Sequence, residues 1–313
     1  MTPVSSIKVA AAFCAALFLA GCDSAEERAE AHYQSGLELL EAGDVDRALV
    51  EFRNVFKLNG SHREARQTYA RVVRERGDMR EAYGQYLRLV EQYPDDAEGR
   101  LALAEMAFLS QNWEEFERHA PAAIEAQPDD PAAQAVAIGL TYRGTILPDE
   151  DPEARDMVLV EATEMRQTLP ENEIVLRVLV DGALRQGDAE AALEAINATL
   201  ALSPDDRGLY RQRLRTLIEL GREDEIEAQL RTEVTQFPED DNAKAQLIRF
   251  YLARQELDQA EEFLRSIIDP AAEDPGHYPS LIQFLREFRG PGAALADLEI
   301  AISSSPNPLP FRA

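Results

Sequence analysis

The sequence predicts an all-α solenoid built from about eight helix-turn-helix units. The first observation is that prolines recur at an almost constant interval: Pro94, Pro128, Pro170, Pro204 and Pro238 are separated by 34, 42, 34 and 34 residues. The second is that two helical stretches lie between consecutive prolines. The third is that the same residue types return at the same offsets within each interval. A fixed period of this length indicates stacked repeats, in which each unit packs only on its neighbours.

Each unit presents its features in one order. A small residue on the first helix allows close approach of the second helix, a glycine ends the first helix, and an alanine and a large apolar residue follow on the second. In the unit 173–206 these residues are Ala183, Gly187, Ala192 and Ile196. Gln111 and Gln255 replace the turn glycine in two units, which predicts less tight turns there, because glycine adopts a left-handed cap most easily.

Short acidic motifs follow the second helices: "YPDD" from Tyr93, "QPDD" from Gln127, "SPDD" from Ser203 and "FPED" from Phe237. Proline cannot continue a helix, so it ends the second helix of its unit. The aspartates that follow are expected to cap the next first helix and to face the positive end of its dipole. Much of the chain's acidity then needs no ligand to explain it.

Two parts of the array depart from the pattern. After a first helix from Pro131 to about Tyr142, an insertion near 144–152 delays the second helix, and it is either a binding loop or a tolerated solvated loop. The last strong helix, 292–303, is apolar nearly all round, although terminal repeats normally need a polar outer face. Either a longer array has been shortened here, or this end packs on a partner or on itself. Residues 307–313 form a tail.

Residues 1–21 have the pattern of a signal peptide. Lys8 precedes the apolar run Val9–Ala20, which is too short for a permanent membrane span, and Leu19-Ala20-Gly21-Cys22 resembles the lipobox of bacterial lipoproteins. That resemblance implies lipid on Cys22, a covalent group that would be the chain's only cofactor, and a short tether over 22–28. An ordinary signal peptide and a buried apolar helix remain alternatives. Cys14 would be removed with the peptide, which leaves no cysteine pair for a disulfide.

The 34-residue unit resembles the tetratricopeptide repeat over residues 29–306. The resemblance implies a right-handed superhelix that acts as a protein-binding scaffold, with a groove lined by the second, fifth, ninth, twelfth and thirteenth residues of each unit. In the first three units these positions carry six acids and two arginines, and in the fourth to seventh they carry six arginines and two acids. The candidate contact residues in the first half are Tyr33, Leu37, Leu40, Arg71, Arg74, Leu101 and Phe108, and in the second half Arg143, Arg177, Arg185, Arg211, Arg215 and Arg249.

Arginine in a groove suits carboxylates, because its planar fork donates two parallel hydrogen bonds. We therefore expect an acidic peptide segment or an anionic polysaccharide to bind the arginine half. The alternative is that these arginines pair with acids of the adjacent unit.

Composition and motifs argue against other function classes. The excess of 58 acidic over 32 basic residues disfavours nucleic-acid binding, which depends on clustered basic side chains. The four histidines are scattered without metal-ligand spacing, and no phosphate loop, serine elbow or Cys-His pair is present in the sequence. We expect a binding scaffold without catalytic or metal-binding residues.

The combined prediction is a lipid-anchored scaffold that faces the periplasm and binds other envelope proteins. By analogy with similar lipoproteins it would aid assembly or export of an envelope component, such as exopolysaccharide or secretion machinery. The alternatives are a sequestering regulator or spacer and an accessory subunit of an envelope enzyme. Asp23 follows Cys22, which favours the inner membrane under the enterobacterial sorting rule, while the outer membrane stays open.

Overall fold

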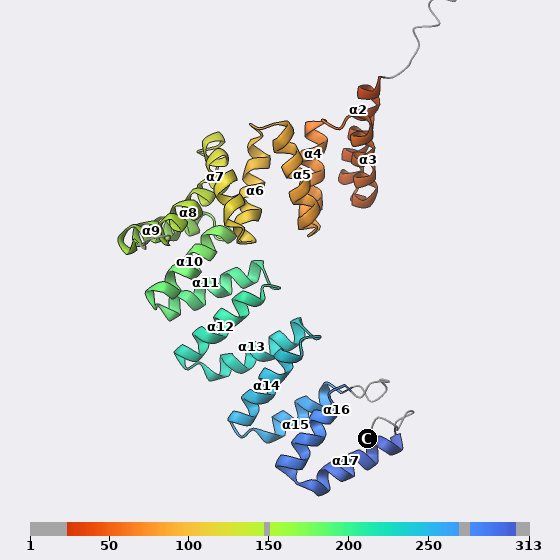
Figure 1. The fold of residues 1–313 in the computed structure, drawn as a ribbon, viewed down its shortest axis with the longest axis vertical. Coiled ribbons are helices and arrows are strands. Elements are labelled where there is room, and N and C mark those ends of the chain that lie inside the picture. The colour runs from red at the N-terminus through yellow and green to blue at the C-terminus, as the bar shows by residue number, and fades with distance from the viewer. Residues whose placement is uncertain (1–23, 147–150, 269–275, 305–313) are drawn as a thin grey trace, which may run out of the picture. The chain divides into compact units, whose positions relative to one another are not determined.

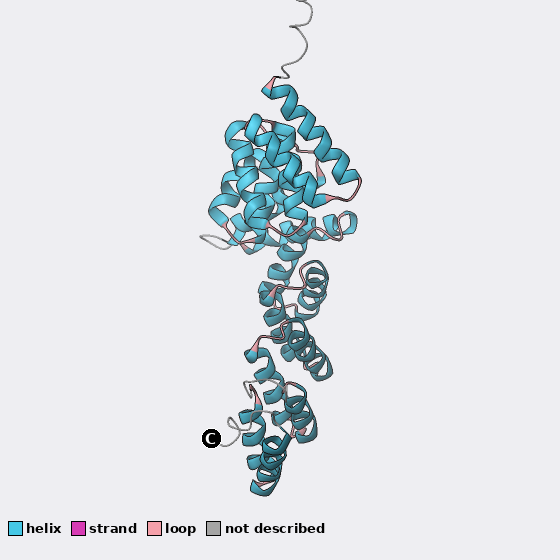
Figure 2. Cartoon of the chain, turned by 90° about the vertical axis from the view of Figure 1, so that its right-hand side faces the viewer, coloured by secondary structure: helices cyan, strands magenta, loops and turns pink. Residues whose placement is uncertain are grey.

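The structure is a computed structural model that describes residues 24–146, 151–268 and 276–304. The predicted signal peptide, Cys22, part of the insertion, and the tail lie outside these residues. Every regular element in the described ranges is a helix, and within each compact part of the chain helices that follow one another pack as antiparallel pairs (Figures 1 and 2). The predicted α-solenoid is therefore confirmed.

The chain divides into two compact units, Met1–Leu179 and Val180–Ala313. The first unit contains α2 (Ala25–Glu41), α3 (Val45–Leu58), α4 (Arg63–Glu75), α5 (Met79–Gln92), α6 (Ala97–Leu109), α7 (Trp113–Ala126), α8 (Pro131–Ile146) and α9 (Pro152–Thr168). The boundary falls inside α10 (Glu173–Gln186). The second unit continues with α11 (Ala189–Leu202), α12 (Arg207–Leu220), α13 (Glu223–Gln236), α14 (Asp241–Ala253), α15 (Leu257–Ser266), α16 (Tyr278–Phe284), a π-helical segment (Leu285–Arg289) and α17 (Pro291–Ser304).

The helix caps follow the acidic motifs. In each motif the last aspartate accepts hydrogen bonds from backbone N–H groups of the next first helix; these residues are Asp96, Asp130, Asp206 and Asp240. These contacts satisfy donors that a helix start leaves without an internal partner. The interpretation of the motifs as helix punctuation is confirmed.

Small residues bring the helices of a pair together, as predicted. A Cβ atom added at Gly36 would lie 2.5 Å from the Phe52 ring, so only glycine fits between α2 and α3. Ala48 and Ala82 are fully buried, and they belong to the core that the large side chains Phe52 and Tyr86 also fill. A further apolar cluster lies in the first unit and another lies in the second.

The turns at Gln111 and Gln255 correct our expectation. Both residues adopt the left-handed conformation, with φ of 57° and 60°, as Gly43 and Gly77 do. The hydrogen bonds are also the same: Asn112 N donates to Ala107 O at 2.8 Å, and Asp78 N donates to Val73 O at 3.0 Å. These turns are as tight as the glycine turns because the same pair of backbone bonds holds them.

Two boundaries differ from the prediction. α2 begins at Ala25, inside the predicted tether, because Ser24 and Glu27 form a capping box. α8 continues four residues past Tyr142 to Ile146, and α9 starts at Pro152 with Asp151 as its cap. The insertion is therefore shorter than the sequence pattern suggested.

α17 has one packed face and one exposed face. Ala294 is buried, and Leu298 and Ala301 pack against the core cluster of the second unit. Leu295 and Ile300 are 61% and 65% exposed. Two large apolar side chains of α17 are therefore exposed to solvent.

Candidate partner-binding surfaces

Residues of α4, α5 and α6, from two consecutive repeats, surround one surface cavity of about 420 Å³ in the first unit, and most of them lie on the first helices α4 and α6. We call it the inner-helix cavity. Of the predicted contact residues, it brings together Arg71 and Arg74 from α4 with Leu101 from α6. The other residues that line it are Glu75, Met79, Tyr86, Glu98, Ala102 and Glu105.

The inner-helix cavity contains one paired and one unpaired arginine. Arg74 Nη1 lies 2.8 Å from Glu105 Oε2, and both side chains are mostly buried. Arg71 is exposed and makes no hydrogen bond or ion pair with any residue that the structure describes. Its guanidinium is therefore available to a carboxylate of a bound segment.

Apolar groups also line this cavity. Met79 is 52% exposed and Leu101 is half-buried. Tyr86 is buried, and this burial raises the pKa of its hydroxyl to about 12, so the tyrosine is neutral at physiological pH. A ligand would therefore meet apolar surface beside separate positive and negative charges.

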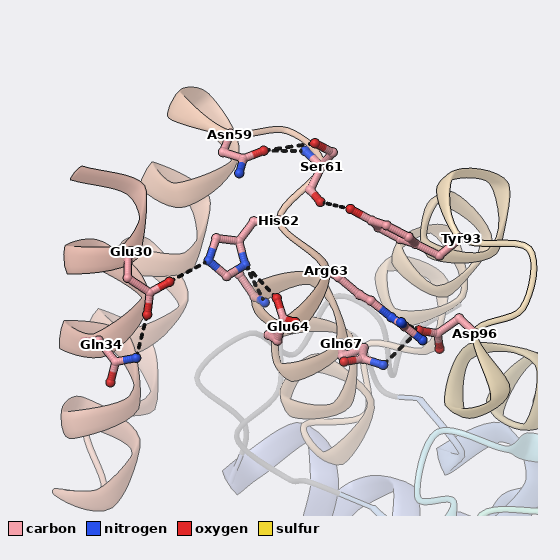
Figure 3. Close-up of polar contacts among 11 residues, drawn as sticks. Glu30, Gln34, Asn59, Ser61, His62, Arg63, Glu64, Gln67, Tyr93 and Asp96 are labelled. Carbon is pink, nitrogen blue, oxygen red and sulfur yellow. Dashed lines mark hydrogen bonds and ion pairs between the residues drawn. The ribbon is translucent and has the colours of Figure 1, made fainter. Parts of the chain in front are cut away.

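The predicted contact residues of the first repeat lie nearer to the repeat interface than we expected. The Tyr33 ring is 5.0 Å from the His62 ring and 6.0 Å from the Phe52 ring, measured between centroids. His62 Nε2 in turn lies 3.2 Å from Glu30 Oε2 (Figure 3). Leu37 and Leu40 are partly buried against the same core. These side chains therefore pack within the first repeat, and Tyr33 also contacts the second through His62.

The position of Phe108 contradicts its assignment to the groove. The side chain is only 7% exposed, and its ring contacts those of Trp113 and Phe116 edge-on, with centroids 5.7 and 5.2 Å away. Both partners belong to α7, the second helix of the same repeat. Phe108 is a core residue because these two rings cover it.

Besides Arg74, three more of the predicted groove arginines have acidic partners. Arg143 Nε donates to Glu117 at 2.8 Å, and its guanidinium lies over the Trp113 ring at 4.4 Å. Arg177 pairs with Glu173 at 2.7 Å and Arg185 with Asp181 at 2.6 Å, each within one helical turn. Arg143 on α8 thus pairs with the preceding repeat, and Arg177 and Arg185 each pair with an acid of their own helix.

The remaining predicted arginines, Arg211, Arg215 and Arg249, are exposed, and the described part of the chain offers none of them a hydrogen-bond or ion-pair partner. Sequence reasoning missed the exposed apolar neighbour Ile218, which is 61% exposed one turn after Arg215 on α12. The signal was available, because Ile218 holds the twelfth position of its unit, where groove contacts are expected.

No group of three or more histidine, cysteine, aspartate or glutamate side chains in the described ranges could hold a metal ion. Across the same ranges no helix is both long and apolar enough to cross a membrane.

The geometry defines the class of protein: an array of helix-turn-helix repeats with its candidate contacts on first helices. Two segments, 39–100 and 217–282, match the sequence model of the tetratricopeptide repeat, one in each unit. These segments are tetratricopeptide repeats, and the fold is a solenoid of that type.

Solved structures with a similar fold include a tetratricopeptide repeat protein from Parabacteroides merdae, which is 11% identical at a TM-score of 0.47 and matches 83% of this chain and 99% of its own. The tetratricopeptide domain of P58(IPK) is 12% identical at a TM-score of 0.42, with coverage of 90% and 85%. No curated protein sequence matches the chain.

Proposed function

We propose that this protein is a non-enzymatic, lipid-anchored scaffold of the bacterial cell envelope, whose first-helix surfaces bind segments of other envelope proteins. The observation that carries the binding role is the inner-helix cavity. Residues from two consecutive repeats line it, it has exposed apolar surface, and its arginine Arg71 has no described partner. Tetratricopeptide repeats generally serve as protein-binding scaffolds, which supports this assignment.

The anchoring part of the proposal is supported by the sequence Leu19-Ala20-Gly21-Cys22 after an apolar run. Dual or triple acylation gives stable membrane attachment, whereas one acyl chain binds only marginally. Attachment near the first repeat would keep the array next to the envelope machinery that it helps to assemble or export. Asp23 favours the inner membrane as the site of attachment.

Site-specific photo-crosslinking in intact cells tests the binding role. A photoreactive amino acid at Leu101, inside the inner-helix cavity, should capture one or a few envelope proteins that mass spectrometry can identify. The same group at Arg88, an exposed residue of the second helix α5, is the matched control. Equal capture at both positions, or none at Leu101, would contradict partner binding at the inner-helix cavity.

A further inference from the structure

A second surface, in the Val180–Ala313 unit, carries unpaired positive charge. Arg211 and Arg215 lie one turn apart on α12, so their side chains share one face of that helix. Arg249 on α14 follows Arg215 by 34 residues and so holds the same position in the next repeat. We call these three residues the arginine face.

Arg211 and Arg215, which have no partner among the described residues, differ in this respect from their neighbours on α12. Two other arginines of α12 are paired: Arg207 binds Asp240, and Arg213 donates to Asn197 at 2.6 Å and to Gln229 at 2.8 Å. Like charges one turn apart also repel and destabilise a helix. Arg211 and Arg215 therefore repel each other on α12.

Apolar surface accompanies the charge. Ile218 is 61% exposed on α12, and Leu252 is partly buried at the corresponding position of α14. Glu219 is the one acid among the groove positions of these two helices. The five groove positions of each helix carry no aromatic ring, although sugars are commonly bound by stacking on aromatic rings. Charge beside aliphatic surface fits a peptide better than a polysaccharide.

We propose that the arginine face binds an acidic peptide segment of a partner protein, with its carboxylates on Arg211, Arg215 and Arg249 and an apolar side chain beside Ile218. This inference rests on the proposed scaffold function and names its partner class. Guanidinium groups suit such a ligand because each can donate two parallel hydrogen bonds to a carboxylate.

Binding of a defined peptide by the detergent-solubilised full chain tests the proposal. The probe is a short fluorescein-labelled peptide in which pairs of glutamates flank a leucine, and its glutamine counterpart is the neutral control. Fluorescence anisotropy should show binding of the acidic peptide alone. The variant Arg211→Gln, Arg215→Gln, Arg249→Gln should weaken it about tenfold or more, because all three charge-assisted contacts are lost.

A second triple variant separates a site from a general charge effect. Arg80, Arg88 and Arg286 are exposed, have no partner within the described ranges, and lie off the arginine face. Changing all three to glutamine alters the net charge equally and should leave peptide affinity within about twofold of the original. Equal weakening by both variants would overturn the proposal, as would binding of polygalacturonate, an anionic polysaccharide, in place of the peptide.

The outcome also distinguishes this inference from the scaffold function. If crosslinking at Leu101 captures partners but the arginine-face variant binds the acidic peptide unchanged, the scaffold stands and the arginine face is not its site. If Leu101 captures nothing while the peptide result holds, the arginine face is a binding site and the inner-helix cavity is not.

Discussion

Gln111 and Gln255 show the conformational free energy that a residue other than glycine costs at a turn. Both hold a left-handed backbone conformation that disfavours side chains by roughly 1–2 kcal/mol, whereas glycine adopts it freely. The same backbone hydrogen bonds form in either case. The array therefore keeps its turn geometry and accepts strain where glycine is missing.

Relieving this strain should stabilise the protein. We expect Gln111→Gly to raise the free energy of unfolding by up to ~1 kcal/mol, because the relief exceeds the extra entropy that glycine gives the unfolded chain. Urea denaturation followed by circular dichroism measures the change. Gly77→Ala is the matched opposite case, since its φ is 83° and no atom crowds the position, and it should destabilise by about 1 kcal/mol. A loss of stability in Gln111→Gly would contradict the account.

His119 is buried among charged groups. Arg100 Nη1 lies 3.0 Å from its Nδ1, and Glu115 Oε2 lies 3.3 Å from its Nε2 without hydrogen-bond geometry. Burial first, and then the charge of Arg100, hold the pKa of His119 below its ordinary value, while Glu115 opposes them. The folded protein therefore resists protonation of this ring.

This shift predicts acid sensitivity. Below the ordinary pKa of about 6.5 the unfolded chain binds a proton that the folded chain does not, so the free energy of unfolding falls as the pH drops. His119 should contribute up to ~1.4 kcal/mol per pH unit until the folded pKa is reached. Urea denaturation at about pH 7 and pH 5.5 should show a smaller loss for His119→Gln than for the unmodified protein. Equal losses would exclude His119 as the cause.

At the scale of elements, Asp96 joins two repeats. It is fully buried at the start of α6, where its carboxylate accepts from Gly99 N at 2.8 Å. It also accepts from Arg63 Nε at 2.6 Å and Gln67 Nε2 at 2.9 Å, both on α4 (Figure 3). One side chain thus caps a first helix and binds the first helix of the preceding repeat.

Removing this carboxylate should cost more than removing an ordinary cap. We expect Asp96→Ala to lower the free energy of unfolding by about 2–3 kcal/mol, which combines the cap with the lost bonds to α4. Asp78→Ala is the control, because among the described residues the Asp78 carboxylate accepts only from Glu81 N, at 3.2 Å, and it should cost about 1 kcal/mol. Equal costs in thermal or urea denaturation would show that the contacts to α4 contribute nothing.

The sequence predicted the elements well because their signals are local or periodic. The 34-residue interval is a periodic signal that shows where each repeat recurs. The turn glycines and the capping aspartates are local signals, because they lie within one or two turns of the structure they determine. Side-chain partners were less predictable. Phe108 is buried by two rings of α7, and Arg143 finds Glu117 across a repeat boundary. Such contacts depend on the angle between helices, which a position number does not specify.

At the scale of the whole molecule, the predicted lipid anchor determines where in the cell the protein is held. We expect the mature chain to begin at a lipidated Cys22, so metabolic labelling with an alkyne-bearing fatty acid should mark the protein. Cys22→Ser should abolish the label, because serine lacks the sulfur that carries the lipid. Cys14→Ser, in the segment predicted to be removed, is the control and should label normally. Label on Cys22→Ser, or an intact mass that retains residues 1–21, would contradict lipidation at Cys22.

The carboxylate of Asp96 also has a mechanical consequence. Because the same side chain holds the start of α6 and the flank of α4, a pulling force that frees one contact weakens the other at once. The two repeats that meet there should yield in a single abrupt event, recorded as one tall step in a force-extension trace. A linkage of this kind lets an array of small units bear tension without a large continuous core.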